Sequence, residues 1–201
     1  MPLCPYKCTS ATKRATVKAL CKTHYPSEME KLKFFATTVI GLEDIASKEV
    51  ESLTGARAEL DVGRIAFQGS LKDVYLLNLR AATINKVFIE LCRSTFEDLN
   101  DIYKLARGLD YTWIMDAQQT FAIRSERIGV HNFTSMDVSR VAGQAIIDSF
   151  ANATGKRLKV NLDEPDVEIY CLVRERDFIM GVNITGASLH KRGYRVYSHP
   201  A

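Results

Sequence analysis

Hydrophobic and polar residues follow regular patterns from residue 33 onward, and the patterns switch several times between strand-like and helix-like. Runs of β-branched and aromatic residues, or alternation of apolar and polar residues, predict strands. Apolar residues three or four positions apart predict helices. The first six predicted elements are a strand, a helix, two strands, a helix and a strand. They cover residues 34–39, 42–53, 58–61, 64–67, 71–79 and 84–92.

This order is typical of the ferredoxin-like split βαβ arrangement, an antiparallel sheet backed by two helices. Gly55 is predicted to end the first helix, because glycine is the usual stop signal. Val62-Gly63 is predicted to connect the two short strands as a hairpin. The sequence therefore predicts a ferredoxin-like α+β domain at residues 33–94.

A second α+β module is predicted at residues 95–201. Its expected elements are a helix, a strand, a long amphipathic helix that Ser135 begins as N-cap, and two strong strands. They cover residues 96–108, 120–127, 135–150, 167–174 and 178–184, with a weaker strand between 157 and 162. Residues 1–32 are unlike either module and form a separate Cys-rich basic leader.

Composition describes an ordinary globular chain, with 46% hydrophobic and 25% charged residues among 201. The longest apolar runs are shorter than the ~18 residues that a membrane span needs. The chain does not open with the pattern of a signal peptide. These observations predict a cytoplasmic protein with no membrane partner.

The net charge of +3 is unevenly distributed. Residues 1–32 hold six Lys or Arg against two Glu, which gives +4, so the remainder carries −1. Residues 186–201 hold three more cations and no acid. Basic ends on a neutral body indicate local contacts with a polyanion rather than a wholly basic nucleic-acid binder.

The basic end segment, together with two arginines of the predicted strand 120–127, supplies the candidate RNA-binding residues. Arginine presents a planar donor fork that suits phosphate, and tyrosine can stack on a base. The candidates are Arg124, Arg127, Ser188, His190, Lys191, Arg192, Tyr194 and Arg195. Other interpretations stay open: a solvated basic surface, an ion pair between Arg124 and Glu126, and inward packing of Tyr194.

The leader contains Cys4, Cys8, Cys21 and His24 in the spacing C-x3-C-x12-C-x2-H. Clustered cysteines in a cytosolic chain favour metal over disulfides, and thiolate and imidazole are the ligands zinc prefers. The spacing predicts a structural zinc site that folds the leader, although it departs from the usual C-x2-C form. The alternative is a flexible basic arm with incidental thiols.

Residues 96–195 resemble a THUMP domain, an RNA-binding module of RNA-modifying enzymes. The matching segments are 120–124, 133–135, 160–162 and above all 188–195. Together with the ferredoxin-like unit ahead of it, this region resembles the amino-terminal half of the guanine-N2 RNA methyltransferases. The resemblance spans about residues 33–201 and does not include the Cys-rich leader.

The resemblance implies an RNA-binding part of an S-adenosylmethionine-dependent enzyme, with tRNA as the expected substrate and ribosomal RNA as the alternative. In that family a catalytic domain follows, with a Gly-rich turn and an Asn/Asp-Pro-Pro-Tyr/Phe motif. Neither is present here: the sequence has no Gly-x-Gly spacing, and its one similar segment, 163–166, has a single proline. We therefore predict no catalytic residue, and S-adenosylmethionine would bind only to a separate or C-terminally fused methyltransferase domain. The rivals are a stand-alone RNA-binding adaptor and a protein-interaction module.

Overall fold

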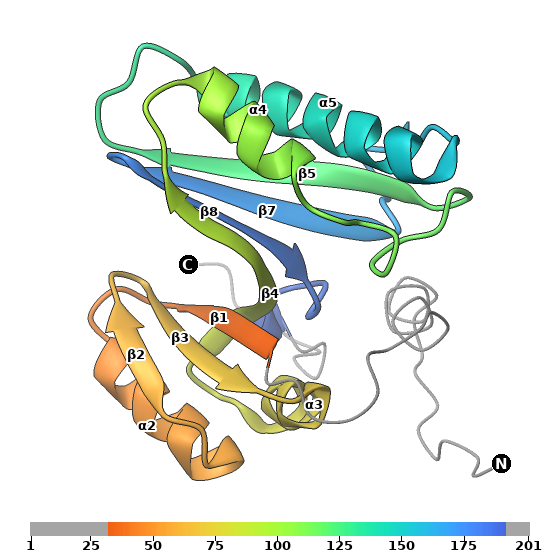
Figure 1. Cartoon of the computed structure of the whole chain (residues 1–201). Helices are drawn as coiled ribbons and strands as arrows, with labels where there is room; N and C mark the ends of the chain where they lie inside the picture. The colour runs from red at the N-terminus through yellow and green to blue at the C-terminus, as the bar shows by residue number, and fades with distance from the viewer. Residues whose placement is uncertain (1–31, 192–201) are drawn as a thin grey trace, which may run out of the picture. The chain divides into compact units, whose positions relative to one another are not determined.

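The computed structural model describes residues 32–191, which form two compact units (Figure 1). The first unit contains residues 32–91 and 181–191, and the second contains residues 92–180. The chain passes from the first unit to the second within one strand and returns within another. The last described segment therefore belongs to the same unit as the first.

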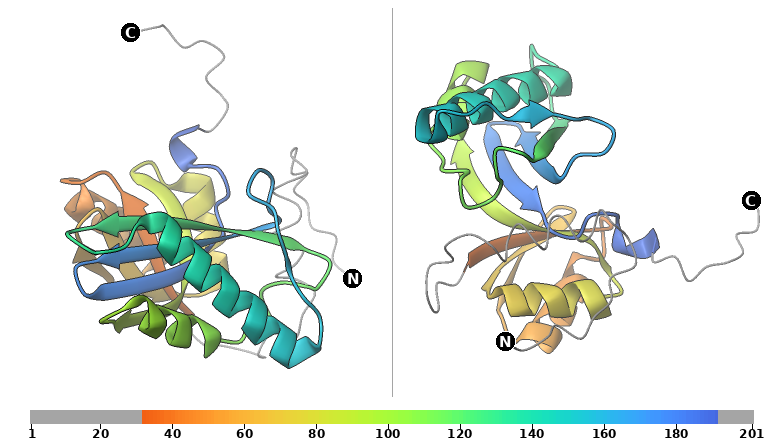
Figure 2. Two further views of the ribbon diagram at one scale, coloured as in Figure 1. Left: turned by 90° about the horizontal axis from the view of Figure 1, so that it is seen from above. Right: turned by 90° about the vertical axis from the view of Figure 1, so that its right-hand side faces the viewer.

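The first unit has the predicted ferredoxin-like order of elements, and the predicted fold class is confirmed. Its elements are β1 (Leu32–Thr38), α2 (Glu43–Thr54), β2 (Ala58–Asp61), β3 (Arg64–Gly69), α3 (Leu71–Arg80) and β4 (Ile84–Thr95). The strands lie in the order β2-β3-β1-β4, and every neighbouring pair is antiparallel. Figure 2 shows α2 and α3 together on one face of this sheet.

Aromatic pairs across β1 hold the core of the first unit together. Phe34 lies opposite Phe67 of β3, with ring centroids 5.5 Å apart, and Phe35 lies opposite Phe88 of β4, with centroids 4.8 Å apart. All four rings are buried. Cross-strand aromatic pairs of this kind stabilise a sheet beyond the area they bury.

Local signals explain where the helices of this unit begin and end. Ser70 and Asp73 form a capping box at the start of α3, with the Ser70 N–H donating to the Asp73 carboxylate over 2.7 Å. Gly55 ends α2 in a left-handed conformation with φ of 70°, which glycine adopts without steric cost.

The second unit packs two helices on one face of a mixed sheet (Figure 1). Its elements are α4 (Leu99–Arg107), β5 (Thr120–Ile128), α5 (Ser135–Thr154), β6 (Lys159–Val160), β7 (Val167–Arg174) and β8 (Asp177–Asn183). The strand order is β8-β7-β5-β6, and β5 runs parallel to both of its neighbours. A short 3₁₀ helix, η1 (Leu189–Lys191), follows β8 and belongs to the first unit.

Two predicted helix starts differ from the structure by a few residues. The predicted helix from residue 96 begins at Leu99, because the Asp98 side chain caps it by accepting from the Asp101 N–H. The predicted N-cap Ser135 is the first helical residue of α5, and Thr134 is its cap. Both shifts arise because several neighbouring residues have side chains suited to capping.

Tyr111 anchors the loop after α4 in the core of the second unit. The residue is 1% exposed, and its hydroxyl donates to the carbonyl oxygen of Ala106 over 2.7 Å. Burial raises the pKa of Tyr111 well above its usual value, so the phenol stays neutral.

The return of the chain to the first unit depends on Gly181 in β8. A Cβ at this position would lie 2.6 Å from Cε1 of Phe35 and 2.8 Å from the carbonyl oxygen of Ile89. Real Cβ atoms do not approach other atoms so closely, so any side chain would displace β8 from β4 or Phe35 from its place in the core.

Gly181→Ala is expected to destabilise the protein by about 1–3 kcal/mol, because the methyl group overpacks a well-filled core. Gly143→Ala is the matched control, since its Cβ would meet only Cδ1 of Ile123 at 3.6 Å. Replacing a mid-helix glycine should stabilise by roughly 0.5–1 kcal/mol. Urea denaturation of the three proteins measures both effects. Equal stabilities for Gly181→Ala and the parent chain would contradict the packing argument.

Between residues 32 and 191, none of the helices combines the length and apolar character required to cross a bilayer. The predicted zinc ligands Cys4, Cys8, Cys21 and His24 lie outside the described residues.

Candidate functional site

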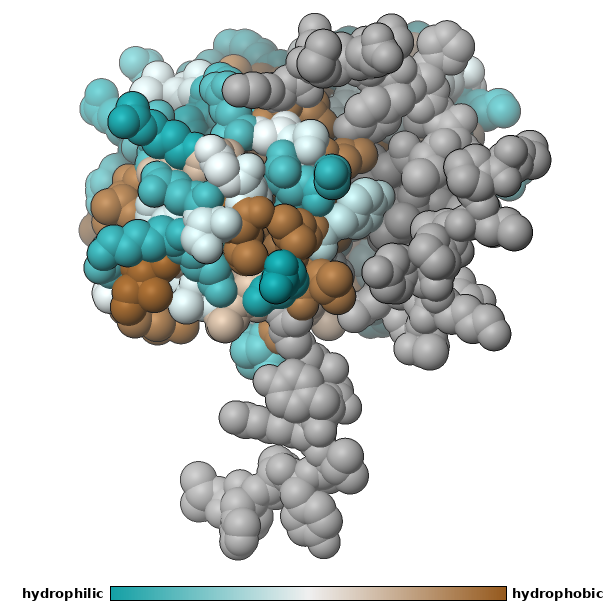
Figure 3. Space-filling view, turned by 90° about the horizontal axis from the view of Figure 1, so that it is seen from below, coloured by the Kyte–Doolittle hydropathy of each residue, from teal (hydrophilic) through white to brown (hydrophobic). Residues whose placement is uncertain are grey.

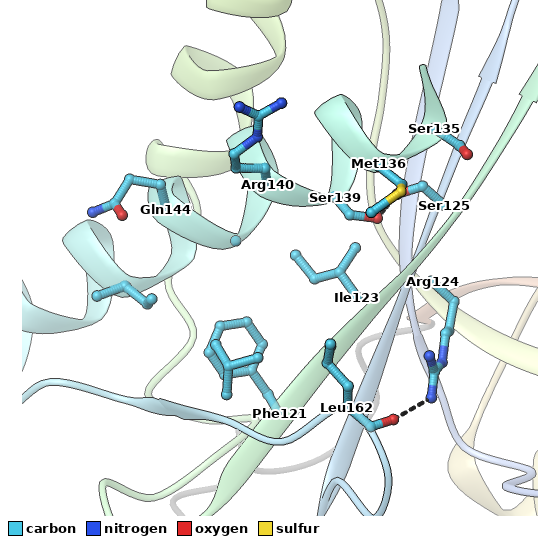
Figure 4. A pocket seen from close by; sticks show the side chains of 13 residues that line it. Phe121, Ile123, Arg124, Ser125, Ser135, Met136, Ser139, Arg140, Gln144 and Leu162 are labelled. Carbon is cyan, nitrogen blue, oxygen red and sulfur yellow. Dashed lines mark hydrogen bonds between the residues drawn. The ribbon is translucent and has the colours of Figure 1, made fainter.

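A groove of about 560 Å³ lies on the second unit, where β5, β6 and α5 meet (Figure 4). Side chains from all three elements and from the loop after β6 line it. They are Phe121, Ile123, Arg124, Ser125, Ser135, Met136, Ser139, Arg140, Gln144, Ile147, Val160 and Leu162, and Gly143 contributes backbone. The volume falls within the range of typical ligand pockets.

The floor of the groove is apolar, and part of its rim is apolar and open to solvent. Phe121 and Ile123 of β5 are buried beneath it. On the rim, Met136 is 78% exposed, Val160 is 52% exposed and Leu162 is 59% exposed. Exposed apolar side chains that surround a cavity are suited to packing against a flat, partly apolar ligand group.

The charged groups that line the groove are all basic: Arg124 on one side and Arg140 of α5 on the other. Within the described lining, every remaining polar side chain is a serine or glutamine. Arg140 pairs with Asp137 one turn earlier on the helix, and its side chain is 76% exposed. The groove therefore combines apolar walls with two arginine side chains, a combination that suits an anionic ligand with a flat ring, such as a nucleotide, better than a neutral or cationic ligand.

Arg124 is held at the groove by two contacts. Its Nη2 donates to the carbonyl oxygen of Leu162 over 2.6 Å, and its Nε lies 3.7 Å from Oε2 of Glu168. The alternative ion pair with Glu126 is therefore wrong. Arg124 pairs with Glu168 because parallel β7 lies beside β5, whereas Glu126 accepts a hydrogen bond from the hydroxyl of Tyr170.

A capping box fixes the end of α5 that forms one wall of the groove. The Thr134 N–H donates to Oδ2 of Asp137 over 2.8 Å, and the Asp137 N–H donates to the Thr134 hydroxyl over 3.3 Å. The hydrogen bond from the Thr134 backbone is the main reason why the pKa of Asp137 lies below its usual value. The ionised carboxylate also suits the positive end of the helix dipole.

Three cations that the sequence analysis missed follow α5. Lys156, Arg157 and Lys159 are all exposed, and they lie between the end of α5 and the groove residue Val160. The signal in the sequence was a basic run directly after the helix stop at Gly155. The run lies between a strongly patterned helix and a weak strand, where hydrophobic periodicity carries no signal for a charged segment.

The candidate residue Arg127 lies near the end of β5 and does not line the groove. Its Nη1 donates to the carbonyl oxygen of Gly129 over 2.9 Å and lies 3.5 Å from Nδ1 of His131. Nε2 of His131 is 2.7 Å from the carbonyl oxygen of Glu175 in the turn between β7 and β8. Arg127 thus helps to order this loop and remains exposed to solvent.

The candidates Ser188, His190 and Lys191 belong to the first unit, whereas Arg124 and Arg127 belong to the second. The Ser188 hydroxyl donates to the carbonyl oxygen of Asn85 over 3.2 Å and lies 2.7 Å from Nδ1 of His190. Ser188 therefore holds its segment against β4, while His190 and Lys191 are exposed. The candidates Arg192, Tyr194 and Arg195 lie outside the described residues.

In the part of the chain that the structure describes, three or more His, Cys, Asp or Glu side chains nowhere gather as a metal site would require. Cys171 is fully buried, and burial raises the pKa of its thiol, which makes it a core residue rather than a ligand. The zinc prediction for the leader stays a prediction.

Comparison with protein families assigns both units. Residues 96–183 match the THUMP domain, and residues 33–88 match the RlmL ferredoxin-like domain. Residues 96–183 are a THUMP domain. The groove lies within this domain, because all of its lining residues fall between Phe121 and Leu162.

Two curated relatives are similar in sequence to this chain over most of its length. A tRNA (guanine(6)-N2)-methyltransferase of Archaeoglobus fulgidus is 46% identical over 182 residues, which are 88% of this chain and 46% of the relative. A ribosomal RNA large subunit methyltransferase K/L of Alteromonas mediterranea is 32% identical over 162 residues, 79% of this chain and 23% of the relative. The chain therefore spans about half the length of the first relative and less of the second.

A solved structure shows the same fold. The crystal structure of a predicted N6-adenine-specific DNA methylase from Listeria monocytogenes superposes with a TM-score of 0.76, covering 86% of this chain and 45% of the other. Sequence identity is 20%, so this likeness concerns the fold alone.

The capping box predicts how stability responds to acid. Asp137 has a folded-state pKa below its ordinary value of 3.8, so its ionised form adds stability above about pH 4. That stability is lost as the pH falls through the folded-state pKa. Asp137→Asn should therefore make the free energy of unfolding fall less steeply between about pH 4 and pH 2, measured by urea denaturation. Identical pH profiles for the two proteins would show that ionisation of Asp137 contributes nothing to stability.

The segment after β8 predicts a second effect on stability. The Thr185 hydroxyl accepts from the Val87 N–H over 2.8 Å and donates to Oδ1 of Asn78 over 2.6 Å. Thr185→Val keeps the shape and leaves both partners unsatisfied, which should cost about 1–3 kcal/mol. The exposed Thr95→Val is the control and should change stability by less than about 0.5 kcal/mol. Thermal unfolding of both variants and the parent chain measures how much the two hydrogen bonds of Thr185 stabilise the fold.

Proposed function

We propose that this chain is the RNA-binding amino-terminal part of an S-adenosylmethionine-dependent tRNA guanine-N2 methyltransferase. The supporting observation is the pairing of an RlmL ferredoxin-like domain with a THUMP domain, at 46% identity to the A. fulgidus tRNA enzyme. The ribosomal RNA relative is less similar, at 32% identity, which favours tRNA over ribosomal RNA as the substrate.

In this proposal the groove of the THUMP domain holds an unpaired nucleotide of the RNA. Arg140 would contact a phosphate, because its guanidinium is exposed and has donors beyond the one that pairs with Asp137. A base or ribose would pack on Met136, Val160 and Leu162, whose apolar surfaces face solvent. Unpaired bases are the usual targets of RNA recognition, because only they expose their faces and edges.

Cations of either unit that do not line the groove would add contacts that do not depend on sequence. Lys156 and Arg157 are exposed beside α5, and Lys191 is exposed at the end of η1. Arg192 and Arg195 continue this basic segment in the sequence. Phosphate contacts position a bound RNA and supply affinity, whereas the unpaired nucleotide would set the register.

Methyl transfer would take place in a domain beyond these residues. S-adenosylmethionine supplies the methyl group, and the described residues offer neither the Gly-rich turn nor the Pro-Pro motif expected for its domain. The role proposed for this chain is therefore to bind RNA and to set the distance between the bound end and the reacting guanine.

A charge-matched pair of double variants tests the RNA interface. Arg140→Ala with Arg157→Ala should weaken binding of a tRNA transcript about tenfold, and should reduce the slope of log K against log salt by about one unit per lost phosphate contact. The control, Lys48→Ala with Lys72→Ala, removes two exposed lysines from α2 and α3 and should change neither quantity by as much.

The same titration separates the proposal from a protein-interaction module. If the parent chain binds tRNA with no dependence on salt, or fails to bind it at low salt, the RNA proposal is wrong. If both double variants lose affinity equally, RNA binding is real but the groove is not its site.

A further inference from the structure

Four apolar side chains reach solvent at one corner of the ferredoxin-like unit. Val39, Ile40 and Leu42 lie in the loop between β1 and α2, and are 56%, 75% and 36% exposed. Val62, in the turn between β2 and β3, is 61% exposed. We call these four residues the apolar corner. Single exposed apolar residues are ordinary, but a group on adjacent loops indicates a surface for a partner.

The two loops of the apolar corner are tied to each other. The Gly63 N–H donates to Oε1 of Glu43, and the Gly41 N–H donates to Oε2 of the same carboxylate, each over 2.8 Å. The Thr38 N–H donates to the carbonyl oxygen of Gly63 over 3.0 Å. The corner is therefore ordered before any partner binds, which lowers the entropy cost of association.

Ile40 packs against the neighbouring turn, because its Cγ1 lies 3.4 Å from the position that a Cβ of Gly63 would take. Hydrogen bonds from Gly63 and from the first turn of α2 hold the pKa of Glu43 below its ordinary value. The carboxylate thus stays ionised at neutral pH and keeps the two loops together. Figure 3, which views the molecule from below Figure 1, shows apolar side chains in brown reaching the surface between teal polar ones.

The apolar corner lies at the end of the sheet where the last described segment is attached. The end of β1 adjoins the start of β4, since Thr38 pairs with Ile84 and the Thr38 hydroxyl donates to the carbonyl oxygen of Thr83 over 2.8 Å. Residues 184–191 are held on the first residues of β4, through Ile184 to Val87 and Ser188 to Asn85. Chain that follows residue 191 therefore starts from this end of the ferredoxin-like unit.

The charge beside the apolar corner argues against RNA as its occupant. Glu43 and Asp44 begin α2 next to it, and their carboxylates would repel phosphate. An apolar surface with an acidic edge fits a protein surface that is apolar at its centre and carries Lys or Arg at its rim.

We propose that the apolar corner is the docking site for the domain that follows this region in the longer relatives. This inference rests on the proposed function, in which a methyltransferase domain lies beyond these residues. The A. fulgidus relative matches this chain over only 46% of its own length, so more than half of it lies outside the match. Docking at the apolar corner would hold that domain in a fixed position relative to the ferredoxin-like unit.

Hydrogen exchange tests the docking site in the protein translated from the complete reading frame, with the 201-residue chain as reference. Amides in segments 39–44 and 61–64 should exchange at least about tenfold more slowly in the longer protein, because docking excludes water and limits opening. Ile40→Asp with Val62→Asp should remove this protection from the longer protein. In the 201-residue chain the same change should leave the melting temperature within about 2 °C, because both side chains are exposed.

Val130→Asp is the matched control, since Val130 is 98% exposed in the THUMP domain and should leave the protection intact. Equal exchange in the longer and shorter proteins overturns the docking site, as does a reading frame that ends at residue 201. RNA binding by the 201-residue chain is measured separately by the salt titration. Absence of RNA binding would count against the proposed function. Absence of protection in the longer protein, with RNA binding intact, would count only against docking.

Discussion

Gly181 has no side chain, and β8 uses that space to approach Phe35 and the carbonyl oxygen of Ile89. This close packing brings the chain back to the ferredoxin-like unit at the last residues of the THUMP domain. Thr185 then satisfies the Val87 N–H, and Ser188 binds the carbonyl oxygen of Asn85. The first unit is therefore discontinuous in sequence: it contains residues that precede the second unit and residues that follow it.

The groove of the THUMP domain depends on a different set of forces. Parallel pairing of β5 with β6 and β7 places the Arg124 side chain beside Glu168 and the Leu162 carbonyl oxygen. The capping box of Thr134 and Asp137 holds the opposite wall. Basic groups over apolar walls give a surface that attracts phosphate and also accepts a flat ring. Neither property requires a sequence-specific contact, so in the proposed function the groove would accept an unpaired nucleotide without reading which base it carries.

The groove of the THUMP domain and the apolar corner differ in chemistry, and this difference assigns them to different binding partners. The groove carries two arginines, whose remaining donors face solvent although each also pairs with a carboxylate, whereas the apolar corner of the ferredoxin-like unit carries Glu43 and Asp44 at its edge. Arginine donors in the groove can bind a phosphate, whereas carboxylates at the apolar corner repel it. In the proposed function, one domain binds RNA while the other holds the catalytic domain in position, so that distance rather than sequence selects the modified nucleotide.

The sequence by itself determined the elements of residues 33–93, because each strand, helix and turn there has its own local signal, such as Gly55 and the Val62-Gly63 turn. It also determined the basic character of the end segment around Lys191. Only the tertiary structure decided that Arg124 pairs with Glu168, that residues 181–191 belong to the first unit, and that side chains of β5, β6 and α5 form a groove. Those features come from contacts between residues distant in the chain, and periodicity along one segment carries no information about its neighbours in space.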